Sequence, residues 1–96
     1  MTREEIIARI RERESELRRL GVARLSLFGS VVRGDSGPAS DVDLLVAFEG
    51  PADFDLYITL KFSLEDLLGK PVDLVMETAL KPRIRRRVES EMIRVA

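Results

Sequence analysis

The sequence GSVVRG at residues 29–34, followed by SDVDLLV at residues 40–46, decides how we interpret the fold of this chain. The second stretch places an Asp-x-Asp pair, Asp41 and Asp43, at the start of an apolar run that is typical of a buried strand. Because side chains alternate between the two faces of a strand, both carboxylates should point the same way. Two such carboxylates can bind one hard cation or bridge two cations. With the glycine-containing turn nearby, they predict a site for a metal-bound nucleotide.

The turn at residues 29–34 supplies the candidate nucleotide-binding residues, which are Gly29, Ser30 and Arg33. Glycine permits a tight turn and a close approach of the backbone to a ligand, Ser30 offers a hydroxyl group, and Arg33 can neutralise a phosphate. The alternative is a plain turn glycine with Ser30 as a helix N-cap. In that case Arg33 would pair with Asp35 or Asp41.

A third aspartate, Asp73, interrupts another apolar run, VDLVM at residues 72–76, at a position that a protein core would not favour. If this segment pairs with the strand that carries Asp43, three carboxylates converge on one patch. We therefore interpret Asp41, Asp43 and Asp73 as a metal-binding triad. The alternative is that Asp41 ends a loop and Asp43 lies at an exposed start of a strand.

Composition restricts the chemistry of the site. The 96 residues include no Cys and no His, which excludes disulfides, thiol catalysis, imidazole bases and zinc sites that need these ligands. A metal ion must bind oxygen ligands, so Mg²⁺ is expected, with Mn²⁺ as the alternative. Residues 35–77 hold ten Asp or Glu against two Lys, whereas residues 78–96 hold six Lys or Arg against two Glu. The acidic segment contains all three aspartates of the proposed triad.

The hydrophobic pattern predicts one α/β (α+β) domain over residues 1–96, with helices and strands in the order α-β-α-β-α-β-α around a small central sheet. The first helix runs from a capping box at Thr2 and Glu5 to Gly21. The expected strands are 22–28, 42–48 and 72–76, and residues 35–40 form a turn. The other helices are a short one from Ser30 to about Gly34, one that ends at Gly69, and a last one that begins near Pro82. The first helix should bury Ile6, Ile7, Ile10, Leu17 and Leu20, and the last one Ile84, Val88 and Met92.

The combined motif resembles the signature of the DNA polymerase β-like nucleotidyltransferases. Gly29-Ser30, ten intervening residues and Asp41-Val42-Asp43 carry this resemblance, with Asp73 in the place of the third carboxylate. More narrowly, the chain resembles the prokaryotic minimal nucleotidyltransferases over about residues 20–96. These are stand-alone catalytic domains and are commonly the antitoxin half of a module with a HEPN-type ribonuclease toxin.

The resemblance implies a palm fold with a small mixed sheet flanked by helices. It implies that Gly29 and Ser30 hold the nucleotide phosphates, that Asp41 and Asp43 bind Mg²⁺, and that Asp73 acts as the third acid beside the acceptor hydroxyl. It further implies two Mg²⁺ ions and transfer of AMP from ATP to a tyrosine of a partner HEPN toxin. Substrate choice would then come from the partner, and a homo- or hetero-oligomer is left open.

Two other functions are open at this stage. The chain could be an antitoxin that neutralises its partner by contact alone, with an inactive acidic site. It could also be a nucleic-acid-binding regulator, although the net charge of −1 and the single Tyr without any Trp argue against nucleic acid as a partner. Such a regulator would use the basic side chains near the C-terminal end, Arg83, Arg85, Arg86, Arg87 and Arg94. We see no apolar segment of membrane length and no signal peptide, and therefore expect a cytoplasmic protein.

Overall fold

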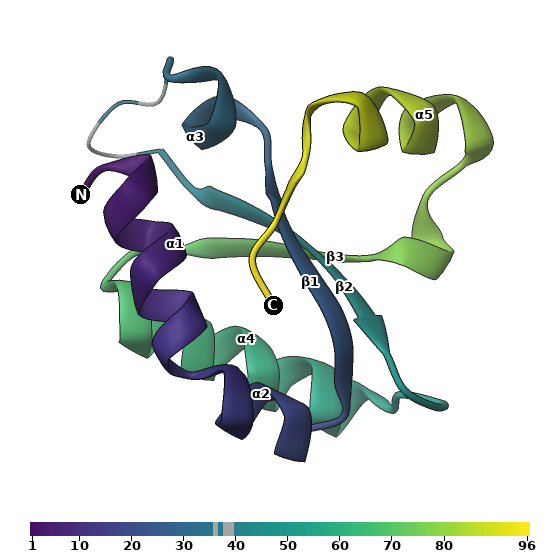
Figure 1. Ribbon diagram of the computed structural model, residues 1–96. Helices are drawn as coiled ribbons and strands as arrows, with labels where there is room; N and C mark the ends of the chain where they lie inside the picture. Colours follow the sequence, from purple (N-terminus) through teal and green to yellow (C-terminus); the bar gives the residue numbers. More distant parts are fainter. Residues whose placement is uncertain (36, 38–39) are drawn as a thin grey trace.

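A four-stranded mixed sheet forms the centre of the fold (Figure 1). The computed structural model describes residues 1–35, 37 and 40–96. Strand β1 (Val22–Phe28) pairs antiparallel with β2 (Val42–Phe48) and with β4 (Ile93–Arg94), while β2 pairs parallel with β3 (Val72–Met76). The strand order is β3-β2-β1-β4. The predicted α+β class and mixed sheet are therefore confirmed, as is the expected adjacency of β2 and β3.

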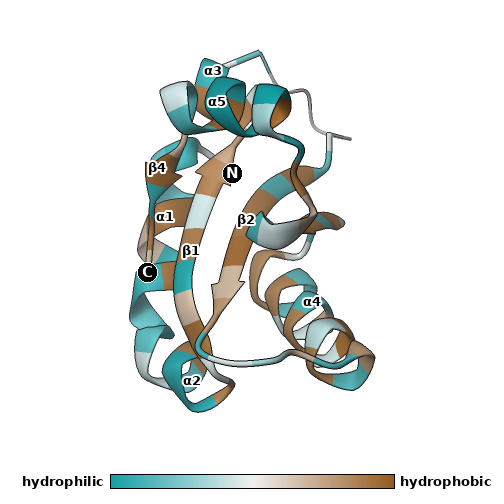
Figure 2. Cartoon of the chain, turned by 90° about the vertical axis from the view of Figure 1, so that its right-hand side faces the viewer, coloured by the Kyte–Doolittle hydropathy of each residue, from teal (hydrophilic) through white to brown (hydrophobic). Residues whose placement is uncertain are grey.

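One face of the sheet packs against three helices, α1 (Arg3–Glu12), α2 (Glu14–Arg19) and α4 (Phe54–Leu68). Hydrophobic colour predominates on β1 and β2 in Figure 2. The main core cluster takes every second residue of β2, Val42, Leu44 and Val46, while Leu45 is buried on the other face. Alternate residues of β2 therefore point to the opposite face, which α1, α2 and α4 leave uncovered. The largest fully buried side chains, each less than 2% exposed, are Ile6, Ile10, Val22, Leu25, Leu27, Val42, Leu44, Val46, Leu60, Leu64 and Leu68.

The N-terminal segment forms two helices, so the prediction of one helix up to Gly21 was wrong. The capping box is present, with the Glu5 N–H donating to Thr2 Oγ1 at 3.1 Å and the Thr2 N–H donating to Glu5 Oε1 at 3.2 Å. The helix ends at Arg13, whose N–H bonds back to Ile10 and Arg11. This break lets α1 pack on α4 while α2 turns toward β1. Leu17 is buried as expected, whereas Ile7 and Leu20 are only half-buried.

Helix α4 covers the open edge of β3, the strand that carries Asp73. The edge of a sheet leaves backbone groups without strand partners, and these need hydrogen bonds from elsewhere. The Tyr57 hydroxyl donates to the Leu74 carbonyl at 2.6 Å, and the Val72 N–H donates to Glu65 Oε2 at 2.9 Å. Two side chains of α4 thus fix β3 in its register beside β2.

The remaining elements are the short helix α3 (Ser30–Arg33), the 3-10 helix η1 (Glu77–Ala79) and helix α5 (Pro82–Glu91). They lie at the two ends of the sheet: α3 follows the end of β1, whereas η1, after β3, lies near the start of β1, where Glu77 pairs with Arg24. Helices α3 and α5 are both at the top of Figures 1 and 2, and the end of α5 reaches α3 through the contacts of Glu91 with Gly29 and Arg33. The expected core face of α5 is largely wrong. Only Val88 is buried, because Ile84 is 50% exposed and Met92 lies beyond the helix end.

Strand β4 was not predicted. Its two residues are too few to show a hydrophobic period, yet they pair with β1 through Ser26 and Leu27. The predicted turn at residues 35–40 includes residues 36, 38 and 39, which lie outside the described residues. Among the residues that the structure describes, no helix is both long enough and apolar enough to cross a membrane.

Candidate active site

The three predicted acids come from two neighbouring strands on the face of the sheet opposite the core. Asp43 and Asp73 are register partners in the parallel pair β2·β3. Asp41 lies one residue before β2. Asp43 is half-buried, and Asp41 and Asp73 are exposed. The fold therefore places Asp73 beside the Asp-x-Asp pair, as the sequence predicts.

Gly29 connects β1 to α3 and lies against Asp43. Its φ of 77° is in the left-handed region, which glycine adopts without strain. A Cβ atom at this position would overlap the Asp43 carboxylate, lying 2.9 Å from its Cγ. Residue 29 must therefore be glycine both for its backbone conformation and for the space that Asp43 fills.

The pKa of the Asp43 carboxyl is raised above its ordinary value. Partial burial is the main cause, and the negative charges of Asp73 and Asp41 add to it. The Arg33 guanidinium and a hydrogen bond from the Ser30 N–H oppose the increase. Burial and the neighbouring negative charges thus disfavour the charged form of Asp43 in the free protein, and a bound cation would favour it.

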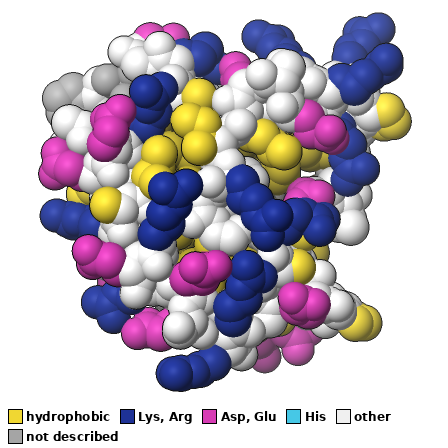
Figure 3. Space-filling model, viewed as in Figure 1, with side chains coloured by type: hydrophobic (Ala, Val, Ile, Leu, Met, Phe, Trp, Pro, Cys, Tyr) yellow, Lys and Arg dark blue, Asp and Glu magenta, His cyan; other side chains and the backbone are white. Residues whose placement is uncertain are grey.

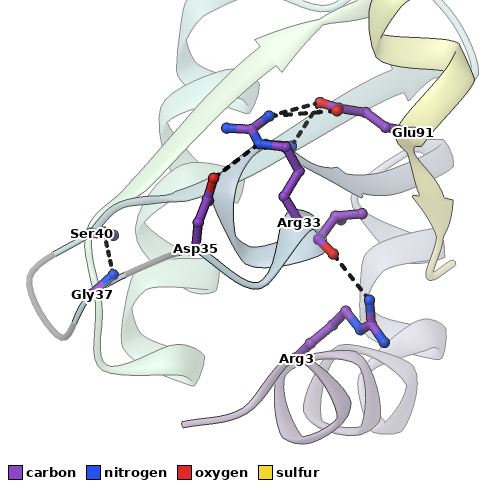
Figure 4. A network of polar contacts seen from close by, with 8 residues as sticks. Arg3, Arg33, Asp35, Gly37, Ser40 and Glu91 are labelled. Atoms are coloured by element: carbon purple, nitrogen blue, oxygen red, sulfur yellow. Dashed lines mark hydrogen bonds and ion pairs between the residues drawn. The ribbon is translucent and has the colours of Figure 1, made fainter.

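Arg33 and the turn contact two further carboxylates (Figure 4). Arg33 donates to Asp35 at 3.4 Å, as one of the sequence alternatives expects. It also donates through Nη1 to Glu91 at 3.2 Å, and the Gly29 N–H donates to Glu91 Oε1 at 3.4 Å. Gly29 is the N-cap of α3 and Ser30 its first residue, so the N-cap alternative for this serine is wrong.

The donor set of the site fits a hard divalent cation. All candidate ligands are carboxylate oxygens, which suit Mg²⁺ and Mn²⁺. Within the described residues, no three acidic side chains are grouped so that they could hold a metal ion by themselves. Mg²⁺ commonly uses only one or two protein carboxylates and takes its other ligands from phosphate and water. The acids therefore fit a metal that arrives with a phosphate-bearing substrate.

Space for a ligand is available on the same face of the sheet. A cavity of about 360 Å³ lies further along β1 and β2 and is lined by Ser26, Leu45 and Met92, among others. Basic side chains gather over α5 at the upper right of Figure 3, close to this face. A second cavity of about 320 Å³ lies between α2 and α4, and neither cavity has any of the predicted site residues in its lining.

Comparison with known proteins identifies the family. Residues 5–95 match the model of the nucleotidyltransferase domain. The chain belongs to the nucleotidyltransferase domain family. It is 44% identical over 96 residues to the protein adenylyltransferase MntA of Thermococcus cleftensis, a match that covers 99% of this chain and 97% of that protein. This nucleotidyltransferase is thus of the minimal, MntA type.

Solved structures agree with this assignment. The nucleotidyltransferase is 44% identical to a protein described as a minimal nucleotidyltransferase, with a TM-score of 0.85 over 97% of this chain and 95% of that one. The MNT antitoxin in a complex with the tri-AMPylated HEPN toxin of Shewanella oneidensis has the same fold. Its TM-score is 0.70 at 20% identity, covering 99% of this chain and 72% of that one. The predicted enzyme class is confirmed, while the roles of the individual site residues stay predictions.

Sequence reasoning did not find Glu91. Its contacts with Gly29 and Arg33 span 62 and 58 residues of sequence, so no local motif shows them. Helix α5 is also rich in arginine, so the sequence offers no reason to single out the glutamate at its C-terminal end.

The close approach of Gly29 to Asp43 predicts that Gly29→Ala destabilises the protein by about 1–3 kcal/mol, because it adds a steric overlap to an unfavourable φ. Gly21→Ala is the matched control for φ alone, since Gly21 has a φ of 86° but no atom within 4 Å of the place that a Cβ would take. Gly50→Ala, with open space and no positive φ, should be nearly neutral. Urea denaturation monitored by circular dichroism measures the three variants. Equal losses for Gly29→Ala and Gly21→Ala would contradict the overlap.

The raised pKa of Asp43 predicts that Asp43→Asn stabilises the metal-free protein at pH 7. The native state holds the Asp43 proton more tightly than the unfolded state does, so wild-type stability falls as pH rises through the ordinary pKa, about 3.9, toward the higher native value. The variant should melt about 2–4 °C higher at pH 7, with the difference vanishing below about pH 3.5. Thermal melts between pH 3 and 8 in chelator test this. A variant that melts lower at neutral pH would show that the Asp43 charge is stabilising.

Proposed function

We propose that this minimal nucleotidyltransferase transfers AMP from ATP to a hydroxyl group, that of a tyrosine, on a HEPN-type ribonuclease toxin, and so acts as its antitoxin. The observation that carries the proposal is the pairing of Asp43 with Asp73 in β2·β3, directly beside the Gly29 turn. The MntA relative is named a protein adenylyltransferase, and a similarly folded antitoxin was solved with an AMPylated toxin. Both support the same reaction here.

The turn and the acids have separate tasks in this proposal. The backbone of Gly29 and Ser30 and the guanidinium of Arg33 bind the phosphates of ATP. Asp41, Asp43 and Asp73 are the residues that would hold Mg²⁺, as two ions. Bound Mg²⁺ would polarise the α-phosphate and offset the charge of the departing pyrophosphate.

The transfer is a displacement at the α-phosphorus. The acceptor hydroxyl oxygen forms a bond to this phosphorus, the bond from the phosphorus to the bridging oxygen of pyrophosphate breaks, and pyrophosphate leaves. Asp73 accepts the hydroxyl proton. Its carboxylate is exposed and comes from a different strand than Asp43, so it can face an acceptor that approaches from solvent. A positioned general base of this kind contributes about 10²–10⁴-fold in rate.

The proposal predicts different defects for the two groups of acids. Asp41→Asn/Asp43→Asn should abolish both the Mg²⁺-dependent binding of ATP and the transfer. Asp73→Asn should keep ATP affinity within a few-fold and reduce single-turnover transfer by at least about 10²-fold. The measurements are calorimetric titration with ATP and Mg²⁺, and transfer from α-phosphate-labelled ATP to a HEPN-type toxin. Asp66→Asn, an exposed aspartate on α4, is the control.

Each part of the proposal can fail separately. Label that appears only on RNA ends or on a small molecule would contradict a protein acceptor. Label on the toxin at a residue other than tyrosine, located by mass spectrometry, would contradict the tyrosine assignment. If the double variant still neutralises the toxin in cells without any transfer, the protein acts by contact alone.

A further inference from the structure

Glu91 occupies the donor groups that the proposed function assigns to nucleotide phosphate. Its Oε1 accepts from the Gly29 N–H at 3.4 Å, and both of its carboxylate oxygens accept from Arg33 Nη1, at 3.2 and 3.5 Å (Figure 4). Glu91 is the last residue of α5, so these contacts also attach the end of α5 to the turn between β1 and α3. An acidic side chain thus lies where an anionic ligand is expected.

A carboxylate and a phosphate are both anionic acceptors that take charge-assisted hydrogen bonds from N–H donors and guanidinium groups. The single Gly29 N–H cannot serve both at full strength. We propose that Glu91 competes with the triphosphate of the nucleotide for the Gly29 N–H and the Arg33 guanidinium. Glu91 holds α5 against the turn in the free protein and is displaced when phosphate binds. This inference rests on the proposed function, because it concerns the same site.

The ion pair between Arg33 and Glu91 is weak enough for a phosphate group to displace Glu91. The side chains of Arg33 and Glu91 are 48% and 26% exposed, and ion pairs this accessible to water are weak. Phosphate, with its greater charge, can therefore take over these donors. Helix α5 has few other attachments: among the described residues Val88 is its one buried side chain, and Arg85 donates to the Glu77 carbonyl at 2.8 Å.

The segment after α5 is anchored independently of Glu91. The Val95 N–H donates to the Leu25 carbonyl at 2.8 Å, and the Ala96 N–H donates to the same carbonyl at 3.1 Å. Displacement of Glu91 should therefore loosen α5 while β4 stays paired with β1. The paired segment gives the experiment an internal reference directly after the helix.

The test compares Glu91→Gln with wild type in calorimetric titrations with the ATP analogue AMP-PNP and with inorganic tripolyphosphate, each with Mg²⁺. The variant should bind both ligands about 2- to 5-fold more tightly, the range expected when an exposed ion pair no longer competes. Glu91→Ala, which also removes the acceptor, should gain at least as much. Glu14→Gln, which removes an exposed glutamate paired with Arg18 at 3.4 Å, is the matched control and should not change.

A second readout follows the helix itself. Hydrogen exchange should become faster in residues 82–91 of wild type when AMP-PNP and Mg²⁺ bind, with residues 93–96 unchanged. In Glu91→Gln the same amides should already exchange faster without ligand. Unchanged or weaker affinity in both Glu91 variants would overturn the inference. Failure of wild type to bind either ligand would instead contradict the proposed function, and this inference with it.

Discussion

The structure of the site depends on the close approach of Gly29 to Asp43. The carboxylate of Asp43 fills the space that any side chain at position 29 would occupy, so the turn after β1 and the start of β2 can only fit together with glycine. The register of the sheet relates Asp43 to a residue on each of the two neighbouring strands. Phe28 pairs with Asp43 across β1·β2, and Asp43 pairs with Asp73 across β2·β3. One steric contact therefore sets the position of the turn after β1 relative to Asp43 and its register partner Asp73.

The two faces of the sheet carry different kinds of side chain. The face toward α1, α2 and α4 carries the apolar residues that stabilise the fold, and alternation along β2 places Asp43 on the other face. Burial, together with the charges of Asp73 and Asp41, raises the pKa of Asp43 and so disfavours its charged form there. A perturbed pKa of this kind is typical of functional sites, and under the proposed function a cation that arrives with the substrate would favour the charged form of Asp43.

The sequence predicted the parts of this structure that local patterns encode. The bounds of β1, β2 and β3 agree with the expected ranges, because β1 alternates apolar and polar residues after Gly21 and the other two strands are short, mainly apolar runs. The break at Arg13, the two-residue strand β4 and the exposure of Ile84 were missed, since they depend on how distant elements pack. The same holds in the site. Spacing alone placed Asp41, Asp43 and Gly29 together, whereas the contact of Glu91 with the turn needs the folded chain. The metal and nucleotide roles of these residues stay predictions.

Paramagnetic relaxation by Mn²⁺ tests the central claim most directly, because it locates the metal without depending on turnover. Nuclear magnetic resonance spectra of the labelled protein would be recorded with AMP-PNP and substoichiometric Mn²⁺. We expect the amide signals of Gly29, Ser30, Asp43 and Asp73 to broaden first, while those of α2 and the C-terminal half of α4, on the other side of the sheet, stay sharp. Broadening centred on another group of acids, such as Glu14 and Glu16 on α2, with Asp43 and Asp73 unaffected, would contradict the account.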